Sequence, residues 1–288
     1  MKYNFITIII TIIFSFTIAV TYYINKDSPA IKYFPIDREL TFSTYETKLQ
    51  LLSQLDADEY DIEWKSKSEL AEPIYLRQDV SLLYANGRLK GMLSKWKENE
   101  KNIELTATIH SEDSSHFQSV AFHHGEVHYP DDEIKSIHAM SQDEIYVIDS
   151  PHSALQSFEQ PTNPIQKEWK HTLDHTTNQQ LSYHWSQLLK YFSIPQKKYN
   201  LIPLTNLHSY QDTPLPGLTQ EETDKIIGQL WEGLYKNYIL EISTSRQPVN
   251  SFVPLILFDK QNTHLMVLFQ DQQGEKQQLI QHYSPPDS

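Results

Sequence analysis

The chain has 288 residues, a formal net charge of −13 and no cysteine. Without cysteine it can have neither thiol catalysis nor a thiolate metal centre. Acidic residues prevail in the first half: residues 27–160 hold 25 acidic and 12 basic side chains, and residues 161–288 hold 12 and 10. This balance argues against a basic groove for nucleic acid. The seven glycines form no phosphate-binding loop, so a nucleotide partner is excluded too.

The segment Phe5–Ile24 is twenty residues long and carries no charge. A helix of this length matches the thickness of the hydrocarbon core of a bilayer. Residues 1–26 are therefore predicted to be a single-pass transmembrane anchor, with residues 5–24 in the cell membrane. A cleaved signal peptide is the alternative, because Thr17-Ile18-Ala19 fits a cleavage site. The absence of cysteine suits a body on the extracytoplasmic side that relies on packing.

Residues 27–42 are predicted to be a stalk between the anchor and a β-rich module at residues 43–150. Ser43-Thr44-Tyr45-Glu46 has the pattern of a capping box. Tyr45, Leu49, Leu52 and Leu55 then recur at helical spacing, which predicts a helix of about three turns. The acidic run Asp56–Glu63 is predicted to be a solvated turn, because it does not match the calcium-loop template.

Between Asp79 and Asp149 apolar residues alternate with polar ones, which predicts an antiparallel β-meander of about five or six strands. Asn86-Gly87 is a strong hairpin signal. The charged run Lys97–Asn102 is predicted to be a turn, and His124-Gly125 to be the turn of a second hairpin.

Residues 151–162 carry two prolines and no periodicity, so they are predicted to be a linker to an α+β module at residues 163–284. Asn163, Pro164 and Gln166 predict the start of a helix that runs to about Phe192. The segment Ile194–Leu218 contains four prolines and is predicted to be a long loop. Loops of this length are often functional.

Thr219 and Glu222 predict the start of a second helix, with an apolar face that includes Trp231. Gly228 and Gly233 each weaken such a helix by about 1 kcal/mol relative to alanine, which indicates a close approach beside them. Three strands, 251–258, 263–270 and 276–283, close the chain as a meander. The predicted fold class is α+β: a transmembrane helix, a β-meander module, and a module of two helices and a three-stranded meander.

One set of candidate metal ligands is His123, Glu126 and His128. If His124-Gly125 is a two-residue turn, His123 pairs with Glu126, and all three side chains share one face of a hairpin. Two imidazoles and a carboxylate suit zinc or another divalent metal. The alternative is an ordinary polar strand face.

A second candidate set is His171, Asp174 and His175. Steps of three and four residues place these side chains on one side of the first helix, away from its apolar face. Two interpretations remain for these residues: they bind a metal ion, or they form an ordinary solvated face of the helix. No cofactor other than such a metal is predicted. Histidines of an exported domain can also respond to pH, because their charge changes near neutrality.

These observations favour a membrane-anchored, extracytoplasmic, non-enzymatic interaction or regulatory module of the cell envelope, because no complete catalytic motif is present. Its partner would be another envelope protein, with Ile194–Leu218 as the contact surface. The alternative is a metal-dependent hydrolase or metal sensor at His123, Glu126 and His128. A third possibility is a glycan-binding module with stacking aromatic side chains. The aromatic side chains considered for stacking are Trp64, Trp96, Trp231, Tyr235 and Tyr238, of which Trp231 and Tyr238 are assigned to the core because of their helical spacing.

Overall fold

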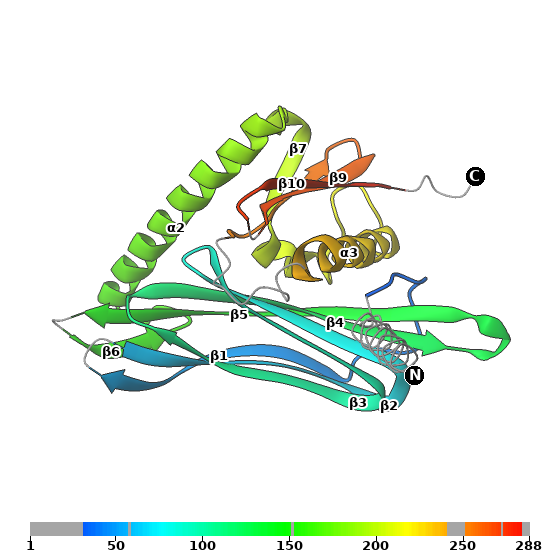
Figure 1. The fold of residues 1–288 in the computed structure, drawn as a ribbon, viewed down its shortest axis with the longest axis horizontal. Coiled ribbons are helices and arrows are strands. Elements are labelled where there is room, and N and C mark those ends of the chain that lie inside the picture. The colour runs from blue at the N-terminus through cyan, green and yellow to red at the C-terminus, as the bar shows by residue number, and fades with distance from the viewer. Residues whose placement is uncertain (1–30, 57–58, 151–152, 241–250, 272, 284–288) are drawn as a thin grey trace, which may run out of the picture. The chain divides into compact units, whose positions relative to one another are not determined.

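The computed structural model describes residues 31–56, 59–150, 153–240, 251–271 and 273–283. It has a mixed α+β fold with two antiparallel sheets and few helices (Figure 1). The predicted anchor, residues 5–24, lies outside the described residues. Within the described ranges, no helix has the length and apolarity needed to span a membrane.

The larger sheet has six strands in the order β1-β2-β4-β5-β6, with β3 paired to β2. This confirms the predicted antiparallel meander. The bounds are β1 Thr44–Asp56, β2 Glu59–Ala85, β3 Arg88–Ser111, β4 Ser115–His128, β5 Ile134–Ser150 and β6 Ser153–Phe158.

The β2–β3 hairpin turns at Asn86-Gly87, as predicted. The two residues have φ of 49° and 78°, the positive values that a type I′ turn requires. The hairpin also folds over on itself, where the pairing of β2 with β3 shifts between Glu69 and Ile74. As a result β2 contributes to both layers of a sandwich, and Trp64 Nε1 donates to Ser81 Oγ across the interior at 3.1 Å.

The interior of the sandwich holds two hydrophobic clusters. One joins β1, β2, β4 and β5 and includes the fully buried Trp64 and Phe117. The other includes Phe42, Ile74 and Ile137. Trp64 is therefore core, and it is not available as a sugar-stacking surface.

The predicted helix at residues 43–55 is wrong, because this segment is β1. Its partner is β2, from Thr44 opposite Glu69 to Asp56 opposite Glu59. Leu49 is buried in the sandwich, whereas Leu52 is 47% exposed. The helical spacing of the leucines was coincidental, and pairing with β2 overrides this local signal.

One predicted turn is wrong and another is too long. Lys97–Asn102 lies inside β3, next to the place where the hairpin bends. In the run Asp56–Glu63 the chain does reverse, since Asp56 pairs with Glu59, but β2 already begins at Glu59. Tyr60 and Ile62 in that acidic run are fully buried. Charged residues on alternate positions of a strand can face solvent, so charge alone did not identify a turn.

The predicted stalk is folded where the structure describes it, over residues 31–42. Ile31 is buried, and the backbone N–H of Phe34 donates to Ser136 Oγ at 2.9 Å. The backbone N–H of Tyr33 donates to a carboxylate oxygen of Glu232 at 2.9 Å. The predicted linker at 151–162 is likewise not without structure, because Ser153–Phe158 pairs with β5 as β6.

Both predicted helices are present with their predicted starts. Helix α2 spans Pro164–Tyr191, and the side chain of Asn163 accepts from the backbone N–H of Gln166. Helix α3 spans Gln220–Leu234 with the complete capping box of Thr219 and Glu222. The structure also contains short helical turns before, between and after these two helices. They are η1 Pro130–Asp132, η2 Gln196–Lys198, η3 Leu204–Tyr210 and η4 Tyr235–Ile239.

Helix α3 packs by its predicted apolar face. Trp231 and Tyr238 are fully buried, and the Trp231 ring stacks on Phe122 with centroids 4.8 Å apart. Gly228 confirms the expected close approach, because a Cβ there would lie 2.6 Å from the ring of Tyr33. Among the described residues nothing lies within 4 Å of the corresponding point at Gly233.

The second sheet has four strands in the order β10-β9-β8-β7: β7 Tyr199–Pro203, β8 Leu255–Asp259, β9 His264–Gln270 and β10 Lys276–His282. The three predicted C-terminal strands are confirmed. The predicted long loop Ile194–Leu218 is wrong, because it contains β7 and η3. Leu204 and Leu207 in that segment are fully buried. The segment is therefore partly packed into the body, while residues 195–198 and 212–214 are exposed. Its use as a contact surface stays a prediction.

Candidate functional site

The predicted hairpin at His124-Gly125 is wrong, because both residues lie inside β4. This strand pairs with β2 on one side and with β5 on the other. Gly125 serves packing and not a turn: a Cβ there would lie 2.4 Å from Ile74 and 2.8 Å from Ile137. A glycine inside a strand often marks a place where a neighbouring group packs closely against the backbone. Close packing, and not a hairpin turn, therefore explains the glycine at position 125.

Side-chain alternation along β4 then separates the first predicted metal set. His123 points into the sandwich, while Glu126 and His128 lie on the opposite face. His128 Nε2 is 2.5 Å from Glu126 Oε1, and the His128 ring stacks on Tyr75 with centroids 3.8 Å apart. Within the described residues, no three His, Asp or Glu side chains are grouped so that they could hold a metal. Metal binding by His123, Glu126 and His128 stays a prediction. The hairpin that would have brought the three side chains together is not present.

His123 instead belongs to a buried polar chain between the two hydrophobic clusters. Its Nδ1 lies 2.7 Å from Asp79 Oδ2, and its Nε2 lies 2.8 Å from Ser141 Oγ. Asp79 Oδ2 also accepts from Ser68 Oγ at 2.6 Å, and the Arg77 guanidinium is 3.9 Å from Asp79. Arg77, Asp79 and His123 are fully buried. In the sequence, this buried polar cluster is indicated by Arg77 and Asp79, which lie two positions apart in a strand. That spacing puts a cation and an anion on the same face of the strand.

The order Asp79–His123–Ser141 has the connectivity of a hydrolase triad. A reaction also needs room for a substrate beside the hydroxyl. Ser141 Oγ is instead 2.6 Å from Thr47 Oγ1, and neither cavity described below is lined by any of these side chains. These hydrogen bonds connect the two layers, although Arg77 Nε and Asp79 Oδ1 are buried without a hydrogen-bond partner among the described residues.

The second predicted metal set is also divided. His171 and His175 are exposed on α2, with parallel rings 6.2 Å apart. Asp174 turns towards the sheet, where it accepts from the Tyr146 hydroxyl at 2.8 Å and lies 3.1 Å from Lys170 Nζ. The expectation that Asp174 faces open solvent with the two histidines is therefore wrong.

Asp174 joins a charged cluster that lines a cavity of about 220 Å³ beneath α2. His116 Nε2 lies 2.9 Å from Glu144 Oε2, and its ring stacks on Tyr146 at 4.1 Å. The hydrogen bond from His116 holds the pKa of Glu144 below its ordinary value, and burial raises the pKa of Tyr146. Because these groups are paired with one another, the cluster fastens α2 to the sheet.

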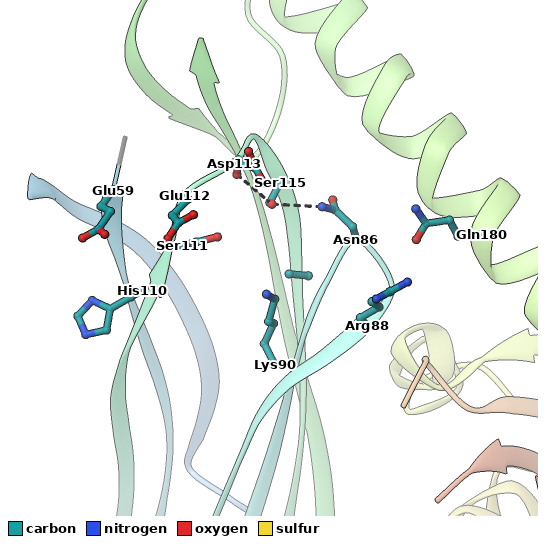
Figure 2. A pocket seen from close by; sticks show the side chains of 11 residues that line it. Glu59, Asn86, Arg88, Lys90, His110, Ser111, Glu112, Asp113, Ser115 and Gln180 are labelled. Atoms are coloured by element: carbon teal, nitrogen blue, oxygen red, sulfur yellow. Dashed lines mark hydrogen bonds between the residues drawn. The ribbon is translucent and has the colours of Figure 1, made fainter. Parts of the chain in front are cut away.

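The larger cavity, about 690 Å³, opens at the end of the sandwich where β2 and β3 meet the β3–β4 connection (Figure 2). One wall is acidic, with Glu59 and Glu112. The other carries Arg88 and Lys90, and Gln180 of α2 lies beyond Arg88. A cavity of this size accommodates a small molecule. The sequence predicted the Asn86-Gly87 turn at its edge, but not the fold of the hairpin that brings the two walls together.

Comparisons with known proteins show no family for this chain. No family model and no curated protein matches it. Two structures of a glycosyl hydrolase family 2 member from Bacteroides cellulosilyticus overlap it with TM-scores of 0.25 at 13% identity, over 41% of this chain and 16–17% of theirs. An Arabidopsis thaliana protein solved in solution overlaps with a TM-score of 0.26 at 14% identity, over 44% of this chain and 93% of its own. Overlaps this slight identify neither a family nor a function.

Proposed function

We propose that this chain is a membrane-anchored, non-enzymatic interaction module of the cell envelope, with its body on the extracytoplasmic side. It binds an extended segment of another envelope protein as an added strand along the outer edge of β3. The observation that carries the proposal is the open edge at Ile103–Ser111. Strand addition to such an edge is a common way to recognise an extended peptide.

The edge is open because β3 pairs with β2 alone among the described strands. Within the part of the chain that the structure describes, only the beginning of this edge is covered by another segment, where the backbone N–H of Leu89 donates to the carbonyl of Ser251. Farther along, the carbonyl of Glu104 accepts from Lys95 Nζ at 3.4 Å, so this carbonyl is directed away from β2. In an antiparallel ladder every second residue has the same orientation. Thr106 and Thr108 therefore also direct their backbone groups outward.

The sequence of this edge also suits strand addition. Native sheets protect exposed edges with charges, and β3 does so in its middle, with Lys95, Lys97 and Glu98. From Leu105 to Ile109 the edge has no charge and contains two threonines, which favour strands. The unprotected part is thus five residues long, close to the length of a typical strand.

Proline at Thr106 and Thr108 tests this edge. It removes the outward N–H groups but leaves the bonds between β2 and β3, and proline is tolerated at such edge positions. We expect the double variant Thr106→Pro/Thr108→Pro to keep its fold and to lose its partner. The measurement is chemical crosslinking of the full chain in native membranes, followed by identification of the adducts by mass spectrometry.

Thr106→Val/Thr108→Val is the matched control, because valine keeps both N–H groups and the strand preference. We expect it to give the same adducts as the wild type. If the proline variant gives the wild-type adducts and the wild-type melting curve, the partner does not bind at this edge.

The orientation is tested separately. The chain has no cysteine, so one cysteine introduced at the exposed position Thr172 of α2 is the only thiol. We expect an impermeant thiol reagent to label Thr172→Cys on intact cells, since the body is proposed to lie outside. Labelling that appears only after the cells are lysed would place the body in the cytoplasm.

A further inference from the structure

We propose that the cavity of about 690 Å³ at the end of the sandwich binds a dipolar small molecule, of the class of free amino acids and short peptides with free ends. The anionic end of the ligand would bind at Lys90 and Arg88, and its ammonium group at Glu112 and Glu59. The cavity meets the end of the open edge of β3 at His110 and Ser111, and binding there does not depend on a protein partner.

The charges that line the cavity are separated by sign. Glu59 begins β2 and Glu112 follows β3, so both belong to the layer that contains the outer part of the hairpin. Arg88 and Lys90 belong to the start of β3 in the other layer. Figure 2 shows Lys90 directed up between the acidic side and Arg88, and Arg88 directed towards Gln180. Residues of both signs therefore line one cavity, and Lys90 is the cation directed towards the acidic side.

These charges are available to a ligand. Among the described residues, Lys90, Glu59 and Glu112 make no ion pair, and all three are exposed. Arg88 lies over the ring of Phe252 at 5.0 Å, which fixes its stem and leaves its donors free for an anion.

The cavity wall is held in place without a ligand. Asn86 Nδ2 donates to Ser115 Oγ at 3.2 Å, and the backbone N–H of His116 donates to Asn86 Oδ1 at 2.9 Å. On the other side the Tyr60 hydroxyl donates to the carbonyl of Asp113 at 2.6 Å. A site that is already ordered loses less conformational entropy when it binds.

Charge decides the class of ligand. A purely anionic ligand would be repelled by Glu59, Glu112 and the neighbouring Asp113, and a purely cationic one by Arg88 and Lys90. An apolar ligand would leave these charges desolvated without partners. Only a molecule with both charges satisfies both walls. Because the walls are open to water, each ion pair contributes modestly, and we expect a dissociation constant of about 0.1–1 mM.

The test uses the full-length chain in detergent micelles and three probes: tri-alanine with free ends, acetyl-tri-alanine and tri-alanine amide. Binding is followed by titration calorimetry and saturation-transfer NMR. We expect tri-alanine to bind about tenfold more tightly than either capped peptide. Lys90→Gln should weaken tri-alanine but not tri-alanine amide, which lacks the carboxylate. Glu112→Gln should weaken tri-alanine but not acetyl-tri-alanine, which lacks the ammonium group.

Lys95→Gln and Glu98→Gln are the matched controls, because both residues are exposed on β3 outside the cavity lining and outside Ile103–Ser111. We expect both to bind like the wild type. The proposal is overturned if the wild type shows no saturable binding up to about 10 mM probe, which is tenfold above the weakest expected constant. It is also overturned if the controls weaken tri-alanine as much as Lys90→Gln and Glu112→Gln do.

Discussion

Replacing Asp79 with alanine is expected to lower the free energy of unfolding by about 3–5 kcal/mol, because the change leaves the Arg77 guanidinium buried without its counter-charge. Both side chains are fully buried, 3.9 Å apart. Burial already lowers the pKa of Arg77, and Asp79 opposes that effect. The same substitution removes the acceptor of Ser68 and of His123. The measurement is urea or thermal unfolding of the full chain at pH 7.5.

A second variant separates the ion pair from simple loss of packing. Arg77→Met/Asp79→Asn removes both charges and nearly preserves the volumes, so we expect it to be more stable than Asp79→Ala alone. The matched control is the exposed pair of Lys67 and Glu46, whose side chains are 2.9 Å apart. Lys67→Ala is expected to leave the unfolding midpoint unchanged. If Asp79→Ala also leaves it unchanged, Arg77 does not need an ionised partner in the interior.

Local signals in the sequence predicted the parts of the fold that depend on neighbouring residues. The turn at Asn86-Gly87 requires positive φ, which these residues adopt readily, and the starts of α2 and α3 require side-chain caps, which Asn163 and Thr219 provide. These features cost little to form in any context, so the tertiary structure did not override them.

The predictions that failed depended on which strand lies beside which. The leucines of β1 fit a helix equally well until β2 is available as a partner. His124-Gly125 fits a turn equally well until Ile74 and Ile137 are known to press on Gly125. A single sequence does not contain that information, because both alternatives use the same residue types.

The candidate cavity was missed for a related reason. Glu59 and Arg88 lie 29 positions apart, and they line one cavity only because the β2–β3 hairpin folds over near Glu69. Pro73 on β2 and Asn99 on β3, with φ of 51°, lie at that bend, but neither residue indicates which strands the folded hairpin brings together. The sequence supplied the charges of the site, and the long-range path of the hairpin supplied their arrangement.

The stability of the body is expected to fall when the pH is lowered from 7.5 to 5.5. Burial lowers the pKa of His124 to about 3, with smaller contributions from His138 and Arg77, and burial lowers the pKa of His138 to about 4. In the unfolded chain both titrate near 6.5. Below about pH 6.5 the unfolded state therefore binds protons that the folded state does not, so stability is complete above this pH and decreases as the pH falls towards 4. For two histidines the loss between pH 7.5 and 5.5 is about 2–3 kcal/mol.

His124→Leu is expected to remove about half of the loss that His124 and His138 cause, because leucine is similar in size and does not titrate. Burial also lowers the pKa of His184 to about 4, and the pH dependence that His184 causes remains in this variant. The unfolding free energy of each variant is measured at intervals between pH 7.5 and 5.5, a range in which most carboxylates stay ionised. His171→Ala is the control, since this histidine is exposed on α2 and should leave the slope unchanged. A wild-type stability that stays constant over this range would show that His124 and His138 accept protons in the folded state. The interior around β4 would then have to contain water or a counter-charge that stabilises their charged forms.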